Sequence, residues 1–250
     1  MLTIDHLSLR YGRAPALTDL TATAGGGRIV ALVGRNGSGK STLLRVAAGL
    51  LAPSAGTVRW NALDVRALPA VQRARCVAYV SQRPLLSIAL SVFDAVALGQ
   101  YSIGRQGKSL AVVEAAIAQL GLEELAHRSF HELSAGEQQR ALVARALVQH
   151  QVNGLLALDE PFSNLDPGEA NRVAKVLRLR ACAGALVLVA THDLTLADQI
   201  ADEVWWLEKG AIIAAGAPAE VLTVDRLRSV FNCDFVRGAH GISLCTRAVQ

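Results

Sequence analysis

Residues 28–47 read RIVALVGRNGSGKSTLLRVA, and this stretch decides the class of fold. The run Arg28–Val33 is apolar and strand-sized, and the run that begins at Ser41 (STLLRV) has the pattern of a helix. Between them, Gly34–Ser41 matches the spacing G-x-x-x-x-G-K-[ST]. Its glycines allow several backbone N–H groups to converge on phosphate oxygens, and the N-terminus of the following helix adds a favourable partial charge. This strand, loop and helix predict a phosphate-binding loop in an α/β fold.

Two side chains of this loop have predicted roles toward a bound nucleotide. Lys40 is placed to reach the β- and γ-phosphates, and the hydroxyl of Ser41 can bind Mg²⁺. An ordinary glycine-rich turn is the alternative, but such a turn requires neither the strand before it nor the helix after it. The residues predicted to bind the nucleotide here are Gly34, Asn36, Gly37, Ser38, Gly39, Lys40, Ser41 and Thr42.

The stretch Leu155–Glu160 (LLALDE) is an apolar strand that ends in two acids. A carboxylate at the tip of a strand in an α/β fold faces the ligand crevice. We predict that Asp159 holds Mg²⁺, directly or through water, and that Glu160 orients or polarises the attacking water. Two exposed acids that only cap a strand are the alternative, which the upstream phosphate loop disfavours.

The rest of the chain predicts an α/β core that a helical segment interrupts. Residues 1–33 read as strands broken by turns at Tyr11–Gly12 and Gly25–Gly27. Continuously apolar strands are typical of a parallel sheet covered on both faces. Further strands are predicted at Cys76–Ser81, Leu155–Leu158 and Ala185–Ala190, and helices at Val92–Leu98, Ser109–Leu120, Gly136–Val148, Glu169–Ala181 and Leu194–Ala201. The tail after about Pro218 has a mixed pattern.

Composition argues against several classes of protein. The 250 residues are 52% hydrophobic, enough for one large core, yet no stretch approaches the roughly 20 apolar residues that span a bilayer. The N-terminus MLTIDHLSLR has no apolar signal region, so we expect a cytosolic chain. The net charge of +4 comes without a long basic run, which gives nucleic-acid binding little support. The four scattered cysteines favour reduced thiols over a zinc site or a disulfide framework.

A third motif narrows the class of nucleotide-binding protein. Leu133–Glu137 reads LSAGE and runs into the helical stretch QQRALVARAL, between the two phosphate-site motifs. It resembles the signature of the ABC ATPase family, usually written LSGGQ. Ser134 and Gly136 are retained, whereas Ala135 and Glu137 depart from the pattern. A capping box formed by Ser134 and Glu137 is the alternative interpretation, and both can hold because a capped helix N-terminus also receives phosphate.

Other residues match marks of the same family, in the same order and along nearly the whole chain. Tyr11 matches the aromatic residue that stacks on adenine, although a plain turn tyrosine is the alternative. Gln82, in YVSQRP, matches a glutamine that senses Mg²⁺ and the γ-phosphate. Asp166, in SNLD, belongs to a loop that touches the other subunit. His192, which ends LVLVATH, matches a switch histidine that contacts the γ-phosphate; a lone histidine elsewhere would be structural.

The resemblance implies a P-loop NTPase fold of the ABC type, in the α/β class. Such a fold has a core with a mostly parallel sheet, an N-terminal antiparallel β subdomain and an inserted α-helical subdomain. On this chain the expected division of the single domain is a nucleotide-binding core (1–83 and 150–217), a helical signature subdomain (84–149) and a C-terminal tail (218–250).

The resemblance also implies how the protein works. Family members form head-to-tail dimers in which the signature of one subunit closes over ATP held by the other. Ser134, Gly136 and Glu137 are therefore expected to bind the ATP of a second copy of the chain. The implied cofactors are ATP and Mg²⁺.

The implied partners are transmembrane permease subunits, and through them a substrate-binding protein, so we expect the chain at the cytoplasmic side of the inner membrane. The segment Pro84–Gln149, above all RPLLSIALSVFDAVALG after Gln82, matches the docking surface for the permease. Packing of the helical subdomain explains the same apolar residues equally well.

The tail AAGAPAEVLTVDRLRSVFNCDFV resembles ATPase subunits of importers for iron–siderophore complexes, haem and cobalamin. Importers of zinc or manganese, an exporter, and a soluble ABC ATPase of iron–sulfur cluster assembly stay open as alternatives. DNA-repair ABC ATPases need a long coiled-coil insertion, and translation-associated ones need two cassettes. The chain has neither feature.

Overall fold

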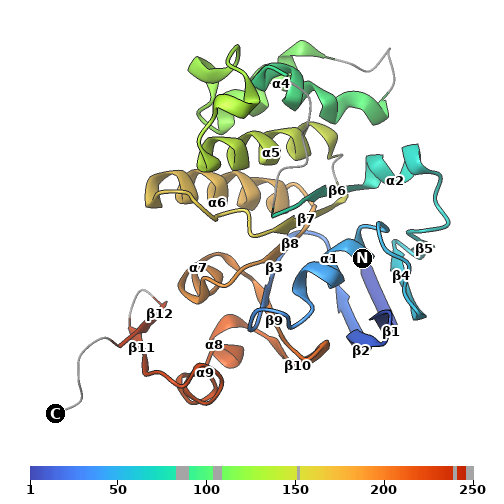
Figure 1. The fold of residues 1–250 in the computed structure, drawn as a ribbon, viewed down its shortest axis with the longest axis vertical. Helices are drawn as coiled ribbons and strands as arrows, with labels where there is room; N and C mark the ends of the chain where they lie inside the picture. Colours follow the sequence, from blue (N-terminus) through green and yellow to red (C-terminus); the bar gives the residue numbers. More distant parts are fainter. Residues whose placement is uncertain (83–89, 104–108, 151–152, 239–240, 246–250) are drawn as a thin grey trace.

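A six-stranded sheet forms the centre of the molecule (Figure 1). The computed structural model describes residues 1–82, 90–103, 109–150, 153–238 and 241–245. The strand order is β10-β9-β3-β8-β7-β6. Five neighbouring strands are parallel, and the edge strand β10 runs antiparallel to β9. The strands are β3 (Arg28–Val33), β6 (Val77–Val80), β7 (Leu155–Asp159), β8 (Leu186–Ala190), β9 (Glu203–Glu208) and β10 (Ala211–Gly216).

A second, antiparallel sheet comes from the N-terminal part of the chain. Its order is β2-β1-β4-β5, from β1 (Leu2–Tyr11), β2 (Ala14–Ala24), β4 (Ala55–Trp60) and β5 (Leu63–Asp64). Helix α1 (Lys40–Ala47) buries Leu43, Leu44 and Val46 in a core shared with this sheet and with the central strands. The phosphate loop therefore leads into a helix that is covered by both sheets.

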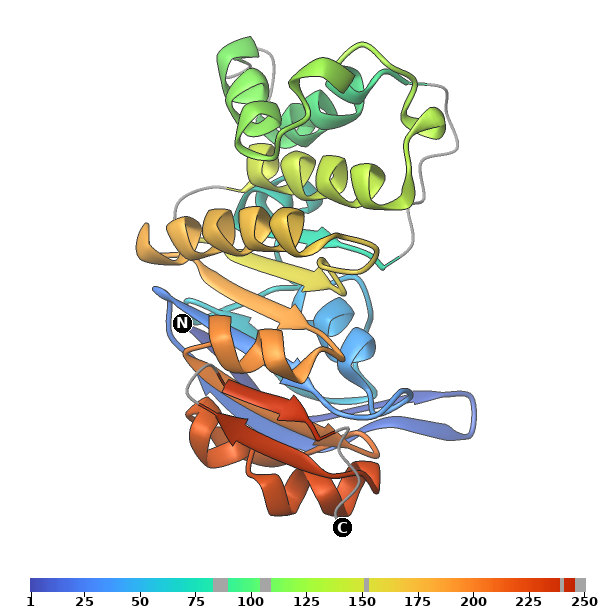
Figure 2. The same cartoon turned by 90° about the vertical axis from the view of Figure 1, so that its left-hand side faces the viewer.

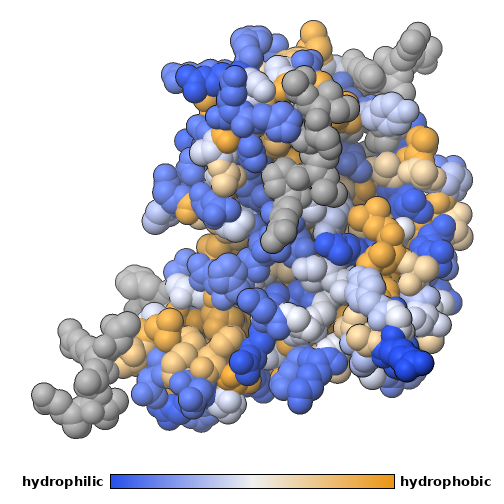
Figure 3. Space-filling model, viewed as in Figure 1, coloured by the Kyte–Doolittle hydropathy of each residue, from blue (hydrophilic) through white to orange (hydrophobic). Residues whose placement is uncertain are grey.

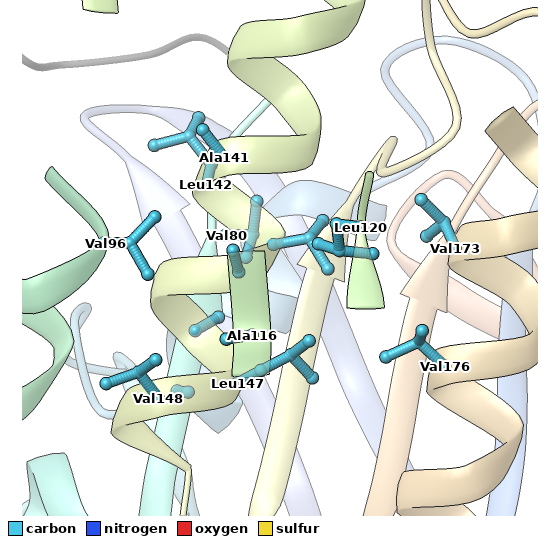
Figure 4. Packing of buried hydrophobic residues seen from close by; sticks show 14 of the residues in the cluster. Val80, Val96, Ala116, Leu120, Ala141, Leu142, Leu147, Val148, Val173 and Val176 are labelled. Carbon is cyan, nitrogen blue, oxygen red and sulfur yellow. The ribbon is translucent and has the colours of Figure 1, made fainter. Parts of the chain in front are cut away.

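Helices cover the opposite face of the central sheet (Figure 2). Side chains of β7 alternate between the two cores: Leu156 and Leu158 face the helical layer, while Leu155 and Ala157 face α1. The helical layer contains α6 (Pro167–Cys182) and α5 (Ala135–Gln149), with α3 (Val92–Ala97), α4 (Leu110–Gln119) and the 3₁₀ turns η1 (Leu98–Ile103), η3 (Glu123–Leu125) and η4 (Phe130–Glu132) beyond them. Figure 4 shows Leu142, Leu147 and Val148 of α5 packed among Val96, Ala116, Leu120 and Val176.

The C-terminal part builds a third core against β3 and β9, on the same face of the sheet as α6 (Figures 1 and 2). It consists of α7 (Leu194–Ile200), α8 (Pro218–Val221), α9 (Val224–Phe231) and the hairpin β11 (Phe235–Gly238) and β12 (Gly241–Leu244). Their buried residues enclose Trp206 of β9 and Val33 of β3. The tail thus packs on the strand that leads into the phosphate loop.

The predicted fold class is confirmed: a mostly parallel sheet, an antiparallel β sheet and a helical segment are all present. The strands and helices predicted from periodicity occur within about two residues of their expected ends. The sequence patterns did not single out β4, β5, β9, β10 and α2 (Ala70–Cys76). The helical interpretation of 84–149 includes 84–89 and 104–108, which lie outside the described residues.

Candidate nucleotide site

Three neighbouring parallel strands bring the predicted phosphate-site motifs to one edge of the sheet. The strands β3, β8 and β7 are adjacent, and Gly34, His192 and Asp159 stand at or just beyond their C-terminal ends. In an open α/β sheet this edge is where ligands bind, because loops from neighbouring strands converge there. Residues more than 100 positions apart therefore share one site.

The phosphate loop needs glycine for two physical reasons. Gly34, Gly37 and Gly39 have φ angles of 143°, 79° and 108°, in the left-handed region that other residues rarely adopt. A Cβ atom at Gly34 would also lie 2.1 Å from the carbonyl oxygen of Leu207. Gly39 is the N-cap of α1 and offers no side-chain cap, so the first N–H groups of that helix stay available for an anion.

Lys40 lies inside the loop, with only 8% of its surface exposed. Its ammonium donates to the carbonyl oxygens of Gly34 at 2.7 Å and Arg35 at 3.2 Å. Burial lowers the pKa of Lys40, and the carboxylates of Glu160 and Asp159 act against that shift. The backbone of the phosphate loop thus holds the positive charge of Lys40 inside the loop.

Asp159 is joined to the first turn of α1. The hydroxyl of Ser41 donates to Asp159 Oδ1 at 3.0 Å. Burial raises the pKa of Asp159, while the hydrogen bond from Ser41, the charges of Arg45 and Lys40 and a hydrogen bond from Tyr79 lower it. Arg45 Nε in turn donates to the Tyr79 hydroxyl at 3.4 Å. No sequence motif assigns a role to Arg45 or Tyr79, so their place beside Asp159 is visible only in the folded chain.

Glu160 and His192 form the second polar pair. His192 Nδ1 lies 2.8 Å from Glu160 Oε2, and the histidine side chain is 70% exposed while the glutamate is nearly buried. Glu160 has a positive φ of 53°, a conformation that is uncommon outside glycine. It is held by its backbone: its N–H donates to Ala190 O at 2.9 Å, and Ser163 Oγ donates to its carbonyl oxygen at 2.9 Å. The carboxylate is therefore aimed by main-chain bonds.

A pocket of about 580 Å³ opens beside this pair. It brings the phosphate loop together with three predicted residues from other parts of the chain: Gln82, Glu160 and His192. It also contains residues that sequence reasoning missed, namely Arg35, Leu194 and Phe231. Phe231 ends α9 in the tail, and no motif connects it with a nucleotide, so only the tertiary structure could identify it.

The other predicted residues lie elsewhere on the chain. Tyr11 ends β1 and is half exposed. Ser134 is the N-cap of α5: Glu137 N donates to Ser134 Oγ at 3.3 Å, and Ser134 N donates to Glu137 Oε2 at 2.7 Å. Asp166 caps α6 in the same way. None of the described residues at these helix starts lines the pocket beside His192.

Gly136 allows the start of α5 to pack closely against the loop that contains Asn164. A Cβ atom there would lie 2.5 Å from Asn164 O, in the loop between Glu160 and α6. The start of α5 therefore packs directly on the SNLD segment, and the capping-box interpretation of LSAGE is correct at the level of local structure. Its predicted role toward the ATP of a second copy remains a prediction.

Comparison with known proteins agrees with this geometry. The family model described as ABC transporter matches residues 17–163. The chain belongs to the ABC transporter family. The family resemblance and the class of enzyme predicted from the sequence are thereby confirmed, and the chain is an ATP-binding, ATP-hydrolysing subunit. No helix among its described residues is long and apolar enough to cross a membrane.

Relatives and solved structures of this ABC ATPase cover almost all of it. It is similar to the hemin import ATP-binding protein HmuV of Pseudomonas entomophila, with 40% identity over 96% of each chain. It is also similar to HmuV of Bordetella pertussis, with 41% identity over 93% of this chain and 92% of the relative. Among solved structures, an inward-facing transporter assigned to the metal-chelate type gives a TM-score of 0.80 at 25% identity, covering 100% of this chain and 99% of the other. An ATP-binding subunit of an ABC transporter gives 0.76 at 28% identity, covering 93% of each chain.

Proposed function

We propose that this ABC ATPase powers an importer of haem or a chemically related metal chelate. The convergence of Lys40, Ser41, Asp159, Glu160 and His192 at one sheet edge carries the ATP-hydrolysing part of the proposal. The cargo class is supported by the relatives named for hemin import and by the metal-chelate type transporter. The C-terminal tail resembles the same group of importers.

The phosphate loop binds ATP through its backbone N–H groups and Lys40. Ser41 and Asp159 supply the hard oxygen atoms that Mg²⁺ prefers, and one or two such ligands suffice where phosphate oxygens complete the coordination. The described residues include no group of three His, Cys, Asp or Glu that could hold a metal ion without a phosphate. When bound, Mg²⁺ neutralises charge on the β- and γ-phosphate oxygens. Gln82 lines the pocket beside His192, where it would contact the metal or the γ-phosphate.

Glu160 orients the attacking water and takes its proton. The water oxygen bonds to the γ-phosphorus while the bond from that phosphorus to the bridging β–γ oxygen breaks, which releases ADP and phosphate. His192, held at 2.8 Å from the Glu160 carboxylate, contacts the γ-phosphate and keeps the carboxylate directed at the water. The near-burial of Glu160 strengthens this interaction.

The complete site requires a second copy of the chain. In the head-to-tail dimer, Ser134, Gly136 and Glu137 of one copy close over the γ-phosphate bound by the other, Asp166 lies in the loop between the copies, and Tyr11 stacks on adenine. The N-terminus of α5, although it is capped by Ser134 and Glu137, suits this role because the helix dipole adds partial positive charge there. A dimeric ABC transporter cassette with 25% identity and a TM-score of 0.78 supports the arrangement.

The dimer binds transmembrane permease subunits at the cytoplasmic side of the inner membrane, and the permease in turn meets a substrate-binding protein. The docking segment lies within Pro84–Leu98 of the helical subdomain (84–149), and residues 84–89 of it are outside the described structure. The nucleotide-binding core comprises 1–83 and 150–217. No nucleic acid takes part.

Growth of the source bacterium on defined iron sources tests the proposal. A strain that lacks this chain should fail to grow with haemin as its only iron source and should grow normally on an iron salt. The wild-type chain should restore growth on haemin, whereas Lys40→Ala should not. Growth on haemin without the chain would overturn the cargo assignment, and a simultaneous loss of growth on a ferric siderophore or of cobalamin uptake would identify the replacement.

A further inference from the structure

The short helix α7, which follows His192, packs between the central sheet and the C-terminal tail. Helix α7 has seven residues, and a helix of this length is not stable in isolation. Its buried residues, Leu194 and Ala197, belong to the third core, to which the tail contributes Val221, Leu222, Leu227, Phe235 and Ile242. Figure 3 shows hydrophobic surface gathered over α8 and α9, next to this core. The tail therefore covers the apolar face of α7.

A group of polar contacts, here called the clasp, joins the hairpin β11–β12 to α7 through Asp198, Thr195, Arg237 and Ile242. Asp198 of α7 accepts hydrogen bonds from Arg237 Nη1 and Nη2, both at 3.0 Å, and from the N–H of Ile242 at 3.1 Å. Thr195 Oγ1 donates to Ile242 O at 2.8 Å. The Asp198 side chain is only 6% exposed, whereas that of Arg237 is 33% exposed. The carboxylate is thus shielded from solvent, and the bidentate geometry makes the pair stronger than a single-contact surface pair.

The clasp bears on the site because α7 begins two residues after His192. Asp193 is the N-cap of α7, and its side chain accepts from Leu196 N at 2.9 Å. Only the N-cap residue Asp193 separates His192 from α7, so the position of α7 bears on the position of His192. Leu194 of α7 and Phe231 of the tail also line the pocket beside His192.

Aromatic contacts fix the tail side of that pocket. The Phe231 ring lies 6.0 Å from Trp206 and 6.1 Å from Phe235 between ring centroids. Trp206 belongs to β9 and pairs with Val33, the residue before the phosphate loop. The tail thus touches both sides of the site, at α7 and at the strand that ends in Gly34.

We propose that Arg237 and Phe231 are positioning residues for the γ-phosphate step, and that the C-terminal tail sets the position of His192 by holding α7. The proposal rests on the proposed role of His192 in the ATPase site. A loosened α7 leaves the phosphate loop and its ATP affinity in place, because Lys40, Ser41 and Asp159 belong to other elements. A loosened α7 would, however, let His192 adopt more positions. A misplacement of about 1 Å in an active site can lower the rate by up to a hundredfold.

The experiment measures ATP turnover of the purified full chain, with ATP affinity measured by calorimetry. Arg237→Ala should lower kcat by about tenfold to a hundredfold and change the KM for ATP less than about threefold. Arg237→Lys keeps the positive charge but loses the bidentate geometry. Its kcat should therefore lie between that of the parental chain and that of Arg237→Ala. Phe231→Ala should act in the same direction as Arg237→Ala.

A control removes another arginine–aspartate pair from the same tail. Arg228 Nε lies 2.8 Å from Asp234 Oδ1, and this exposed pair joins α9 to the start of the hairpin without touching α7. Arg228→Ala should keep the parental kcat. Thermal unfolding of each variant shows whether it folds; if Arg237→Ala does not, Arg237→Lys and Phe231→Ala carry the test.

A double variant separates action through His192 from general damage. His192→Ala should lower kcat by itself, and adding Arg237→Ala should lower it no further. A multiplicative loss in the double variant would overturn the proposal, as would a parental kcat for folded Arg237→Ala. If His192→Ala itself turns over ATP at the parental rate, the proposed function of His192 fails instead, so the two failures are distinguishable.

Discussion

Lys40 is almost buried, and its ammonium is already engaged by two backbone carbonyl oxygens of its own loop. Its burial costs solvation, which is the reason its pKa is lowered. A buried cation that the backbone positions at the uncapped start of α1 is well suited to bind phosphate and poorly suited to any surface role.

Lys40→Ala should therefore remove most of the affinity for ATP. Hydrogen bonds to charged groups contribute about 1.5–3 kcal/mol each, which corresponds to about 10- to 150-fold in the dissociation constant. Calorimetric titration of the folded variant with ATP and Mg²⁺ measures the loss. Unchanged affinity would place the nucleotide elsewhere on the chain.

Tyr79 lies three residues before Gln82, and its hydroxyl connects Arg45 with the Asp159 carboxylate. Tyr79→Phe keeps the ring in the core and removes only this connection. A group that supports a metal ligand typically changes metal affinity by 10- to 100-fold, so the Mg²⁺ concentration for half-maximal turnover should rise by about tenfold. Tyr101→Phe, at a highly exposed position on η1, is the control and should leave the Mg²⁺ dependence unchanged. Equal Mg²⁺ dependence in the two variants would show that the Tyr79 hydroxyl does not support Asp159.

At the scale of elements, the helices of the site begin with side chains that satisfy their first N–H groups, except α1. Helices α5 and α6 have complete capping boxes, formed by Ser134 with Glu137 and by Asp166 with Glu169. Helix α1 begins at Gly39 without a side-chain cap. The phosphate helix is therefore left open to a ligand, whereas the other two are closed locally.

The capping box of α5 gives a pH-dependent prediction. Hydrogen bonds from the backbone and side chain of Ser134 lower the pKa of Glu137. Because the folded pKa is depressed, the stabilisation is present above the unfolded pKa of about 4.3 and is lost as pH falls through the folded pKa. Glu137→Ala should lower the free energy of unfolding at pH 7 by about 0.3–1 kcal/mol, and by less at lower pH. Urea unfolding at the two pH values measures this; an equal loss at both would exclude the charge as the cause.

At the scale of the whole molecule, the acid of the site and the signature helix belong to one chain but are proposed to act on two different ATP molecules. Glu160 lines the pocket beside His192, while Ser134 stands at the start of α5 and lies outside that pocket. A two-fold dimer resolves this separation, since each copy contributes one half to each site.

Glu160→Gln should bind ATP normally and lower turnover by about a hundredfold or more, since it removes the base and keeps the shape. Removing a negative charge beside ATP also favours closure. Size-exclusion chromatography with ATP and Mg²⁺ should show a dimer that disappears with ADP.

Ser134→Arg in the same background should prevent the dimer, because a bulky cation then occupies the signature. Parental turnover of Glu160→Gln would contradict the assignment of the base. Equal dimerisation of the single and double variants would exclude the signature from the shared site.

The sequence by itself determined the family, the fold class and the phosphate loop. These features are local: GRNGSGKS requires only its own glycines and the strand and helix beside it, and LLALDE is a strand with its acids attached. The continuous apolar runs at β3, β7 and β8 predicted a covered parallel sheet because only strands buried on both faces have that pattern. Because parallel strands all end at the same edge of a sheet, the sequence also predicted at which edge Asp159 and Glu160 lie.

Only the tertiary structure decided which distant residues share the site. Tyr79 reaches Asp159 because β6 pairs with β7, and Phe231 reaches the pocket because the tail folds back over β9 and α7. The strands β4 and β9 likewise depend on partners far away in the sequence, β1 and β3. The edge strands β5 and β10 pair with β4 and β9, the strands just before them. Strand order and the docking of one core on another are set by long-range packing, which leaves no fixed spacing in the chain. For that reason the site residues outside a motif were absent from the prediction, and the clasp between Arg237 and Asp198 appeared only in the folded molecule.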